Sequence, residues 1–303
     1  MGKIKVNEYI LKNPKIKDNK TILCMSDIHG NIEALEDILK LIKDFKFDYI
    51  LIPGDTVDTL TQNRQEEFLD KVIELSKYAK TYLALGNHDI LLKRANKNMI
   101  EEKDYDKYLF FNKLKNINNL KLFTNDYESI KLDDNINLSI LNFDNKYYKV
   151  HEKRKQFDEF INNLKVDELN NDKFNILLVH SPNCLIKKKK IILNKTTNDK
   201  DLILCGHNHG GLTPTWAQDL FKNHIGIVGP YNGIIESLAY GIWTNDNKSL
   251  ILSNGVTKMS EGASFKLIHG IGNAILIPEI ELIHLENDKE HSVKLIKRTN
   301  YKI

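Results

Sequence analysis

Five short runs of mainly apolar residues stand out along the chain, at positions 21–25, 49–52, 81–85, 175–179 and 202–205. Runs of about four to eight residues with little polar interruption are typical of strands that are covered on both faces. Behind Asn31, a good N-cap residue, apolar residues from Ile32 to Ile42 recur at helical spacing, and a second helix is expected at 65–78. Strand, helix and strand therefore alternate, which predicts parallel strands.

The remainder of the chain predicts a second sheet and further helices. A charged and aromatic stretch at about 91–119 indicates a helical insertion, which would either form a lid or simply pack on the body. A helix is expected at 152–164. The architecture expected is an α/β fold with a two-sheet β-sandwich core flanked by helices, in a single domain over residues 1–303. The strands assigned to the second sheet or to the C-terminal region lie near 121–123, 129–132, 136–141, 238–243, 249–252, 274–285 and 292–296.

Composition changes this picture little. The chain has 303 residues, of which 41% are apolar and 28% charged, and its net charge of +3 gives no strong nucleic-acid signal. Cys24, Cys184 and Cys205 show no CxxC spacing, so reduced thiols are expected. Residues 1–20 lack an apolar signal region and no stretch is long enough for a transmembrane segment, so we expect a cytoplasmic protein. The oligomeric state stays open.

Metal-capable side chains follow each of the five predicted strands. Side chains that leave the ends of parallel strands can converge at one edge of a sheet. One such residue alone is better explained by a structural role, but five ordered blocks with flanking glycines favour a metal site. Nitrogen and oxygen ligands without thiolate suit manganese, iron, zinc, cobalt or nickel better than calcium. The candidate ligands are Asp27, His29, Asp55, Asn87, His180, His207 and His209, and Asp55 is suited to bridge two ions.

These blocks resemble the signature of the calcineurin-like metallophosphoesterase superfamily, DxH, GDxxD, GNHD/E, H and GHxH. The resemblance implies a four-layer α/β/β/α fold and a dinuclear metal centre that hydrolyses phosphoesters through a metal-bridging hydroxide. It implies that His88 protonates the leaving oxygen while Asp58 orients its ring; a turn or cap role for Asp58 is the alternative, and Asp89 is expected only to cap a helix. By the same resemblance one ion would be held by Asp27, His29, Asp55 and His209, and the other by Asp55, Asn87, His180 and His207.

Departures from the family's patterns bear on the substrate. Ser26, Thr59 and Asp89 stand where the protein phosphatase branch has other residues, and Thr59 replaces an arginine that would clamp phosphate. Turn motifs after His209 look more like the YkuE and YaeI type of phosphoesterase, which implies a phosphodiester or pyrophosphate in a small-molecule or lipid-linked substrate. The alternatives are a phosphomonoesterase or protein phosphatase, a superfamily nuclease, and a non-catalytic scaffold, which would show eroded ligands.

Overall fold

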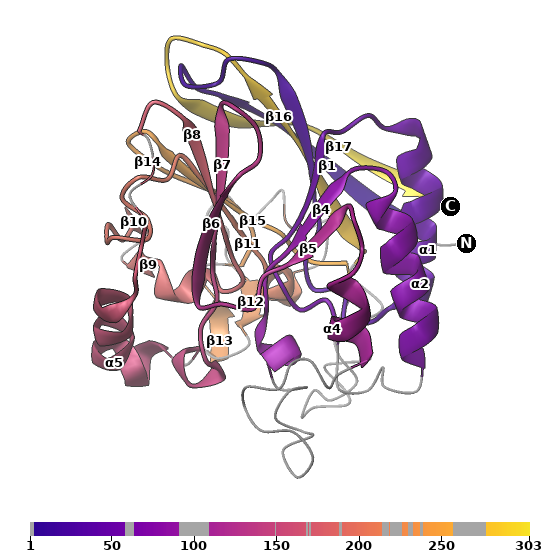
Figure 1. Ribbon diagram of the computed structural model, residues 1–303, viewed down its shortest axis with the longest axis horizontal. Helices are drawn as coiled ribbons and strands as arrows, with labels where there is room; N and C mark the ends of the chain where they lie inside the picture. Colours follow the sequence, from indigo (N-terminus) through magenta and orange to yellow (C-terminus); the bar gives the residue numbers. More distant parts are fainter. Residues whose placement is uncertain are drawn as a thin grey trace.

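Two large β-sheets pack face to face in the computed structural model of the chain (Figure 1). The seven-stranded sheet has the order β17 (Ser292–Lys302), β1 (Lys3–Lys12), β16 (Glu279–Glu286), β2 (Lys20–Cys24), β3 (Tyr49–Ile52), β4 (Lys80–Leu83) and β5 (Leu120–Leu122). The six-stranded sheet has the order β14 (Gly241–Asn245), β15 (Lys248–Leu252), β11 (Leu202–Cys205), β8 (Phe174–Val179), β7 (Ile136–Leu141) and β6 (Tyr127–Lys131). The structure describes residues 3–57, 64–90, 109–148, 150–167, 169, 171–187, 190–213, 218, 226–229, 233–236, 239–256 and 277–303.

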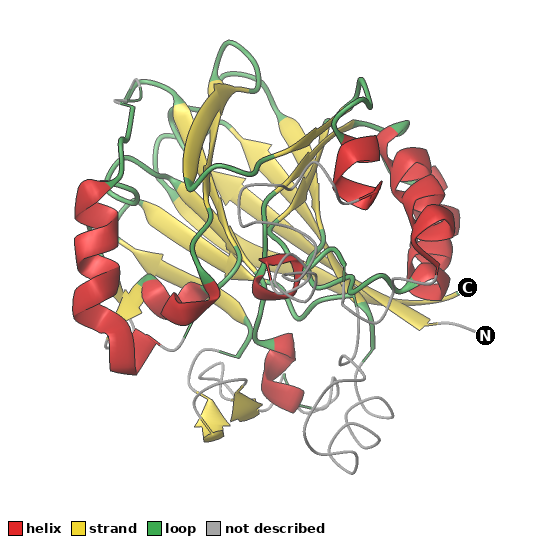
Figure 2. Ribbon diagram, turned by 60° about the horizontal axis from the view of Figure 1, so that its bottom comes forward, coloured by secondary structure: helices red, strands yellow, loops and turns green. Residues whose placement is uncertain are grey.

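Helices cover the outer faces of both sheets (Figure 2). On the first sheet lie α1 (Ile32–Leu41), α2 (Gln65–Ser76) and α4 (Leu109–Leu114), and on the second lies α5 (Val150–Asn163). Asn31 caps α1, because its side chain accepts a hydrogen bond from the backbone N–H of Ala34 at 2.9 Å. Within the described ranges, no helix is long and apolar enough to cross a membrane.

The core consists of three apolar layers, one between the sheets and one under the helices on each side. Alternate residues of a strand enter different layers: Ile22 and Cys24 of β2 face the second sheet, whereas Leu23 packs under α1 and α2. The third layer joins β7, β8 and β11 to Phe157 and Ile161 of α5. Burial on both faces explains why the central strands are apolar throughout. The predicted four-layer α/β/β/α fold is confirmed.

Parallel pairing sets the position of the functional loops. In the first sheet β2, β3 and β4 run parallel to one another. In the second sheet β7, β8, β11 and β15 do the same. The carboxyl ends of each set therefore meet at one edge of its sheet, and the loops that carry the candidate ligands leave from those edges.

Several elements differ from the sequence-based expectation. β5 belongs to the first sheet and not the second, because it pairs in parallel with β4. β1 was missed, since Lys5 and Asn7 occupy positions on its buried inner face where alternation calls for apolar side chains. β17 runs well beyond the predicted 292–296. Of the insertion at 91–119, residues 91–108 lie outside the described part and α4 follows.

Short elements complete the described chain. They are the 3-10 turns η1 (Ile42–Asp44), η4 (Asn145–Tyr147), η5 (Pro182–Cys184) and η6 (His209–Leu212), and the two-stranded pairs β9 (Ile186–Lys187) with β10 (Lys190–Ile191) and β12 (Gly226–Gly229) with β13 (Gly233–Glu236). The η6 turn begins at a candidate ligand, His209. Its two glycines adopt left-handed backbone angles, so the chain reverses sharply directly after that residue.

Candidate metal centre

Five of the candidate ligands have a left-handed backbone conformation. This conformation costs a residue with a side chain roughly 1–2 kcal/mol, so the surrounding structure must hold each one in place. Strain of this kind is common where side chains are aimed at a functional site. The φ angles are 53° for Asp27, 49° for His29, 51° for Asp55, 81° for His207 and 45° for His209.

Hydrogen bonds join the loops after β2 and β3 side by side. The backbone N–H of Asp27 donates to the carbonyl of Gly54 at 3.1 Å, and that of His29 donates to the carbonyl of Asp55 at 3.0 Å. The loop after β11 is tied to the same place, because the backbone N–H of His207 donates to both carboxylate oxygens of Asp27 at 3.1 and 3.0 Å. Loops from both sheets therefore meet at one point.

Three overlapping trios of side chains lie close enough to share a metal ion, with ligand atoms within 4.8 Å of one another. His209 Nε2 lies 3.4 Å from Asp27 Oδ1 and 3.3 Å from His29 Nε2. His180 Nε2 lies 3.0 Å from Asp55 Oδ2. The trios are Asp27, His29 and His209; His29, Asp55 and His88; and Asp55, His180 and His207.

The chemistry of this donor set fits divalent transition ions. Two carboxylates and several imidazoles are buried together without a thiolate among them. Asn87 Oδ1 is buried and has no hydrogen-bond partner among the described residues, which is costly for a carbonyl oxygen unless a ligand satisfies it. His180 Nδ1 lies 3.1 Å from the carbonyl of Pro53; as the N–H donor there, it leaves Nε2 available to a metal.

Burial and charge set the protonation of the same side chains in the metal-free protein. Burial lowers the pKa of His29 to about 4 and holds that of His207 well below its usual range. Burial also opposes protonation of His180, but the charges of Asp55 and Asp27 raise its pKa to about 9. Burial disfavours ionised Asp55, yet His180 and His88 keep its pKa well below the ordinary value. Neutral imidazoles and an ionised carboxylate are the forms that bind metal, so His29, His207 and Asp55 are in the binding form, whereas His180 would release a proton when an ion binds.

His88 lies at the rim of this group. Its backbone N–H donates to Asp55 Oδ1 at 2.8 Å, and its ring packs edge-on against His29 with the centroids 4.6 Å apart. The side chain is partly exposed, whereas the other candidate histidines except His209 are buried. His88 also belongs to one of the three trios, which the sequence did not indicate. Asp58 lies outside the described residues.

Two supporting residues were not identified from the sequence as part of the site. Asp89 caps the turn after β4 by accepting the N–H of Gly86 at 2.8 Å, and it also accepts that of Val57 at 3.0 Å in the loop after β3. Burial, together with the negative charge of Asp55, raises the pKa of Asp89 to about 7. Tyr148 packs its ring on His207 and on His180, with centroid distances of 5.0 and 6.0 Å. No sequence signal singles out Tyr148.

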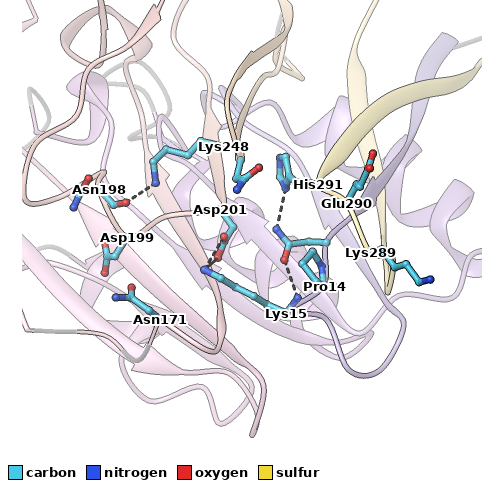
Figure 3. A pocket seen from close by; sticks show the side chains of 12 residues that line it. Pro14, Lys15, Asn171, Asn198, Asp199, Asp201, Lys248, Lys289, Glu290 and His291 are labelled. Carbon is cyan, nitrogen blue, oxygen red and sulfur yellow. Dashed lines mark hydrogen bonds and ion pairs between the residues drawn. The ribbon is translucent and has the colours of Figure 1, made fainter.

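A cavity of about 600 Å³ lies at the opposite, amino-terminal ends of β11 and β15 (Figure 3). Polar side chains at this cavity bond to one another and to Ser249, and the contacts of Lys15 with Asp201 and of His291 with Ser249 join the two sheets. Lys15 Nζ contacts Asp201 Oδ1 at 2.9 Å, and the His291 ring lies 2.9 Å from Asn13 Nδ2 and 2.8 Å from Ser249 Oγ. We call the group of Asn13, Lys15, Asp201, Ser249 and His291 the distal latch, because it joins the ends of the sheets.

The part of the chain that matches a known protein family includes all the loops that carry candidate ligands. The sequence profile of the family described as Calcineurin-like phosphoesterase matches residues 20–211, which is more than half of the 303-residue chain. An uncharacterized metallophosphoesterase of Campylobacter jejuni is 27% identical over 202 residues, or 65% of this chain and 46% of that protein. The chain thus matches about half the length of this curated relative.

Two solved structures show a weaker similarity to the structure of this chain. A dimetal phosphatase from Danio rerio is 11% identical, with 78% of this chain and 87% of that chain covered at a TM-score of 0.39. The NAD nucleotidase of Haemophilus influenzae is 15% identical, with 78% and 50% covered at a TM-score of 0.41. Overlap at this level says nothing about activity. The family profile, in contrast, spans every candidate ligand from Asp27 to His209, and the chain belongs to the calcineurin-like phosphoesterase family.

Proposed function

We propose that the chain is a phosphoester hydrolase with a dinuclear metal centre. The observation that carries this proposal is the position of Asp55, whose carboxylate belongs to two of the ligand trios. One ion is assigned to Asp27, His29, Asp55 and His209, and the other to Asp55, Asn87, His180 and His207. When bound, two divalent ions would neutralise phosphate charge and activate water for attack on phosphorus.

Metal analysis tests the assignment of ligands. We expect about two manganese or iron ions per chain after reconstitution of chelator-treated protein, because the two proposed ligand sets would each hold one ion. His209→Ala should lose mainly one of them, whereas Asp55→Ala should weaken both because its carboxylate is shared. His284→Ala, on the described surface away from these loops, is the matched control. Wild-type protein that binds one ion or none would contradict the proposal.

His88 is proposed to protonate the leaving oxygen, with Asp58 orienting its ring. The partial exposure of His88 and the tie of its backbone to Asp55 Oδ1 at 2.8 Å support this role, because they put a proton donor at the rim of the metal site. General acid catalysis contributes about 10²- to 10⁴-fold in rate. His88→Asn should therefore slow hydrolysis of phenyl esters by that order and affect p-nitrophenyl esters less, since p-nitrophenolate leaves without a proton.

The measurement for His88 is turnover on both ester types together with metal content. Equal losses on the two esters would contradict the acid role. Loss of metal in His88→Asn would instead indicate that His88 is a ligand, in keeping with its trio with His29 and Asp55. Asp58→Asn should reproduce the leaving-group dependence more weakly, because it acts through His88.

The proposed substrate is a phosphodiester or pyrophosphate in a small or lipid-linked molecule. Thr59 in place of a phosphate-clamping arginine, and the turn motifs that resemble the YkuE and YaeI type, support this choice over a protein phosphatase. Parallel assays with bis-p-nitrophenyl phosphate and p-nitrophenyl phosphate compare the two classes. Faster turnover of the monoester would reverse the choice, and no turnover by protein holding two ions would favour a scaffold.

A further inference from the structure

A buried polar cluster lies directly behind the loop that carries His209. Its members come from β1, from β16 and from the connections around them, so they join segments that are far apart in the sequence. Each is at most 8% exposed, although two are acidic and one is basic. We call this group the inner polar cluster, and it consists of Lys5, Gln218, Asn254, Glu279 and Glu281.

The cluster is organised around two shared acceptors. Lys5 Nζ forms an ion pair with Glu279 Oε2 and donates to Gln218 Oε1 at 2.8 Å. Asn254 Nδ2 donates to the same two oxygens, at 2.9 Å to Glu279 and 3.2 Å to Gln218. The Asn254 carboxamide is thereby fixed in orientation, with its Nδ2 towards the ion pair and its Oδ1 on the other side.

The charges inside the cluster are compatible with deep burial. Burial and the negative charge of neighbouring Glu279 hold the pKa of Glu281 well above its usual range, which favours the uncharged carboxyl group. Lys5 and Glu279 then remain as one oppositely charged pair. A buried pair of this kind is seldom the most stable choice compared with apolar residues, but it restricts the geometry of its partners.

The other side of Asn254 abuts the candidate metal loops. Gly210 follows His209, and a side-chain carbon at Gly210 would lie only 2.9 Å from Asn254 Oδ1. A carbon at Gly255 would lie 2.8 Å from Asp27 Cβ, and the backbone N–H of Val256 donates to the carbonyl of Ser26 at 2.8 Å. The segment from Asn254 to Val256 therefore packs against the loops of Asp27 and His209, and Asn254 joins it to the rest of the inner polar cluster.

We propose that Asn254, oriented by the Lys5–Glu279 ion pair, is a positioning residue for the metal ion assigned to Asp27 and His209. His209 needs such support, because its backbone has a φ of 45° and its side chain is 18% exposed. In this role Asn254 would act by holding the loops that carry these ligands. The inference rests on the proposed function, since it assumes that these residues bind metal.

Metal affinity of Asn254→Ala, measured by competition with a chelator on manganese-loaded full-length protein, tests the inference. Loss of a residue that supports a metal ligand weakens binding by about 10- to 100-fold, and we expect this loss for one of the two ions only. Cobalt substitution gives a second readout, because a displaced His209 changes the visible spectrum of one ion. Asn254→Ser should show the same effect and replaces Asn254→Ala if the alanine variant does not fold.

Asn137→Ala is the matched control. Asn137 is also buried, and its Nδ2 donates to Asn175 Oδ1 at 2.9 Å, but it lies at the amino-terminal end of β7, away from the metal loops. It should lower stability without changing metal affinity. Unchanged affinity and cobalt spectrum in the Asn254 variants would overturn the inference while leaving the proposed function intact. Wild-type protein without two ions would overturn both.

Discussion

Asp89→Ala should destabilise the protein strongly, because the Asp89 side chain hydrogen-bonds to the loops after both β3 and β4. Its carboxylate accepts backbone N–H groups from Gly86 at 2.8 Å, Val57 at 3.0 Å and Thr56 at 3.4 Å, and Asp89 is 1% exposed. Alanine leaves these donors buried without an acceptor. Each of the two shorter bonds is worth about 1–3 kcal/mol, so the loss of unfolding free energy should be about 2–6 kcal/mol.

Urea unfolding of chelator-treated protein measures this loss without a contribution from bound metal. Asp288→Ala is the control, since Asp288 makes an exposed ion pair with Lys12 and its replacement should leave stability close to that of the wild type. Asp89→Asn should fall between the two, because the amide retains one acceptor oxygen but turns an N–H towards a donor. A loss for Asp89→Ala no larger than that for Asp288→Ala would refute the role of Asp89.

Two further predictions concern other parts of the molecule. Burial lowers the pKa of His291 below its ordinary 6.5, so the neutral ring in the distal latch adds stability that is fully present above pH 6.5 and is lost as the pH falls towards the lower folded value. Thermal unfolding between pH 5 and about pH 7.5 should therefore depend less on pH for His291→Gln than for wild type, and identical slopes would contradict this. Burial raises the pKa of all three thiols, that of Cys184 to about 12, so a thiol reagent should react with none of them in the native protein and with all three after unfolding.

Local pattern in the sequence was sufficient for the elements that carry the candidate ligands. The runs at 49–52 and 202–205 coincide with β3 and β11, and Asn31 caps α1 as expected. These features depend on neighbouring residues alone. An unbroken apolar run indicates a strand that is buried on both faces, and a side-chain acceptor directly before a helix accepts hydrogen bonds from the helix's first N–H groups. The positions of the candidate ligands at strand ends, and with them the phosphoesterase family, could therefore be predicted from the sequence.

Only tertiary structure decided how distant segments combine. A short apolar strand such as β5 pairs with whichever sheet edge the fold presents. Lys5 on β1 is tolerated inside the protein because Glu279, on the distant strand β16, forms an ion pair with it. Likewise Asp27 and His207 are 180 residues apart and come from different sheets, so their hydrogen bond follows from the packing of the sheets. The sequence by itself determined which side chains lie at the ends of the strands. Long-range packing determined that they meet, because the pairing of distant segments produces no periodic pattern in the local sequence from which it could be predicted.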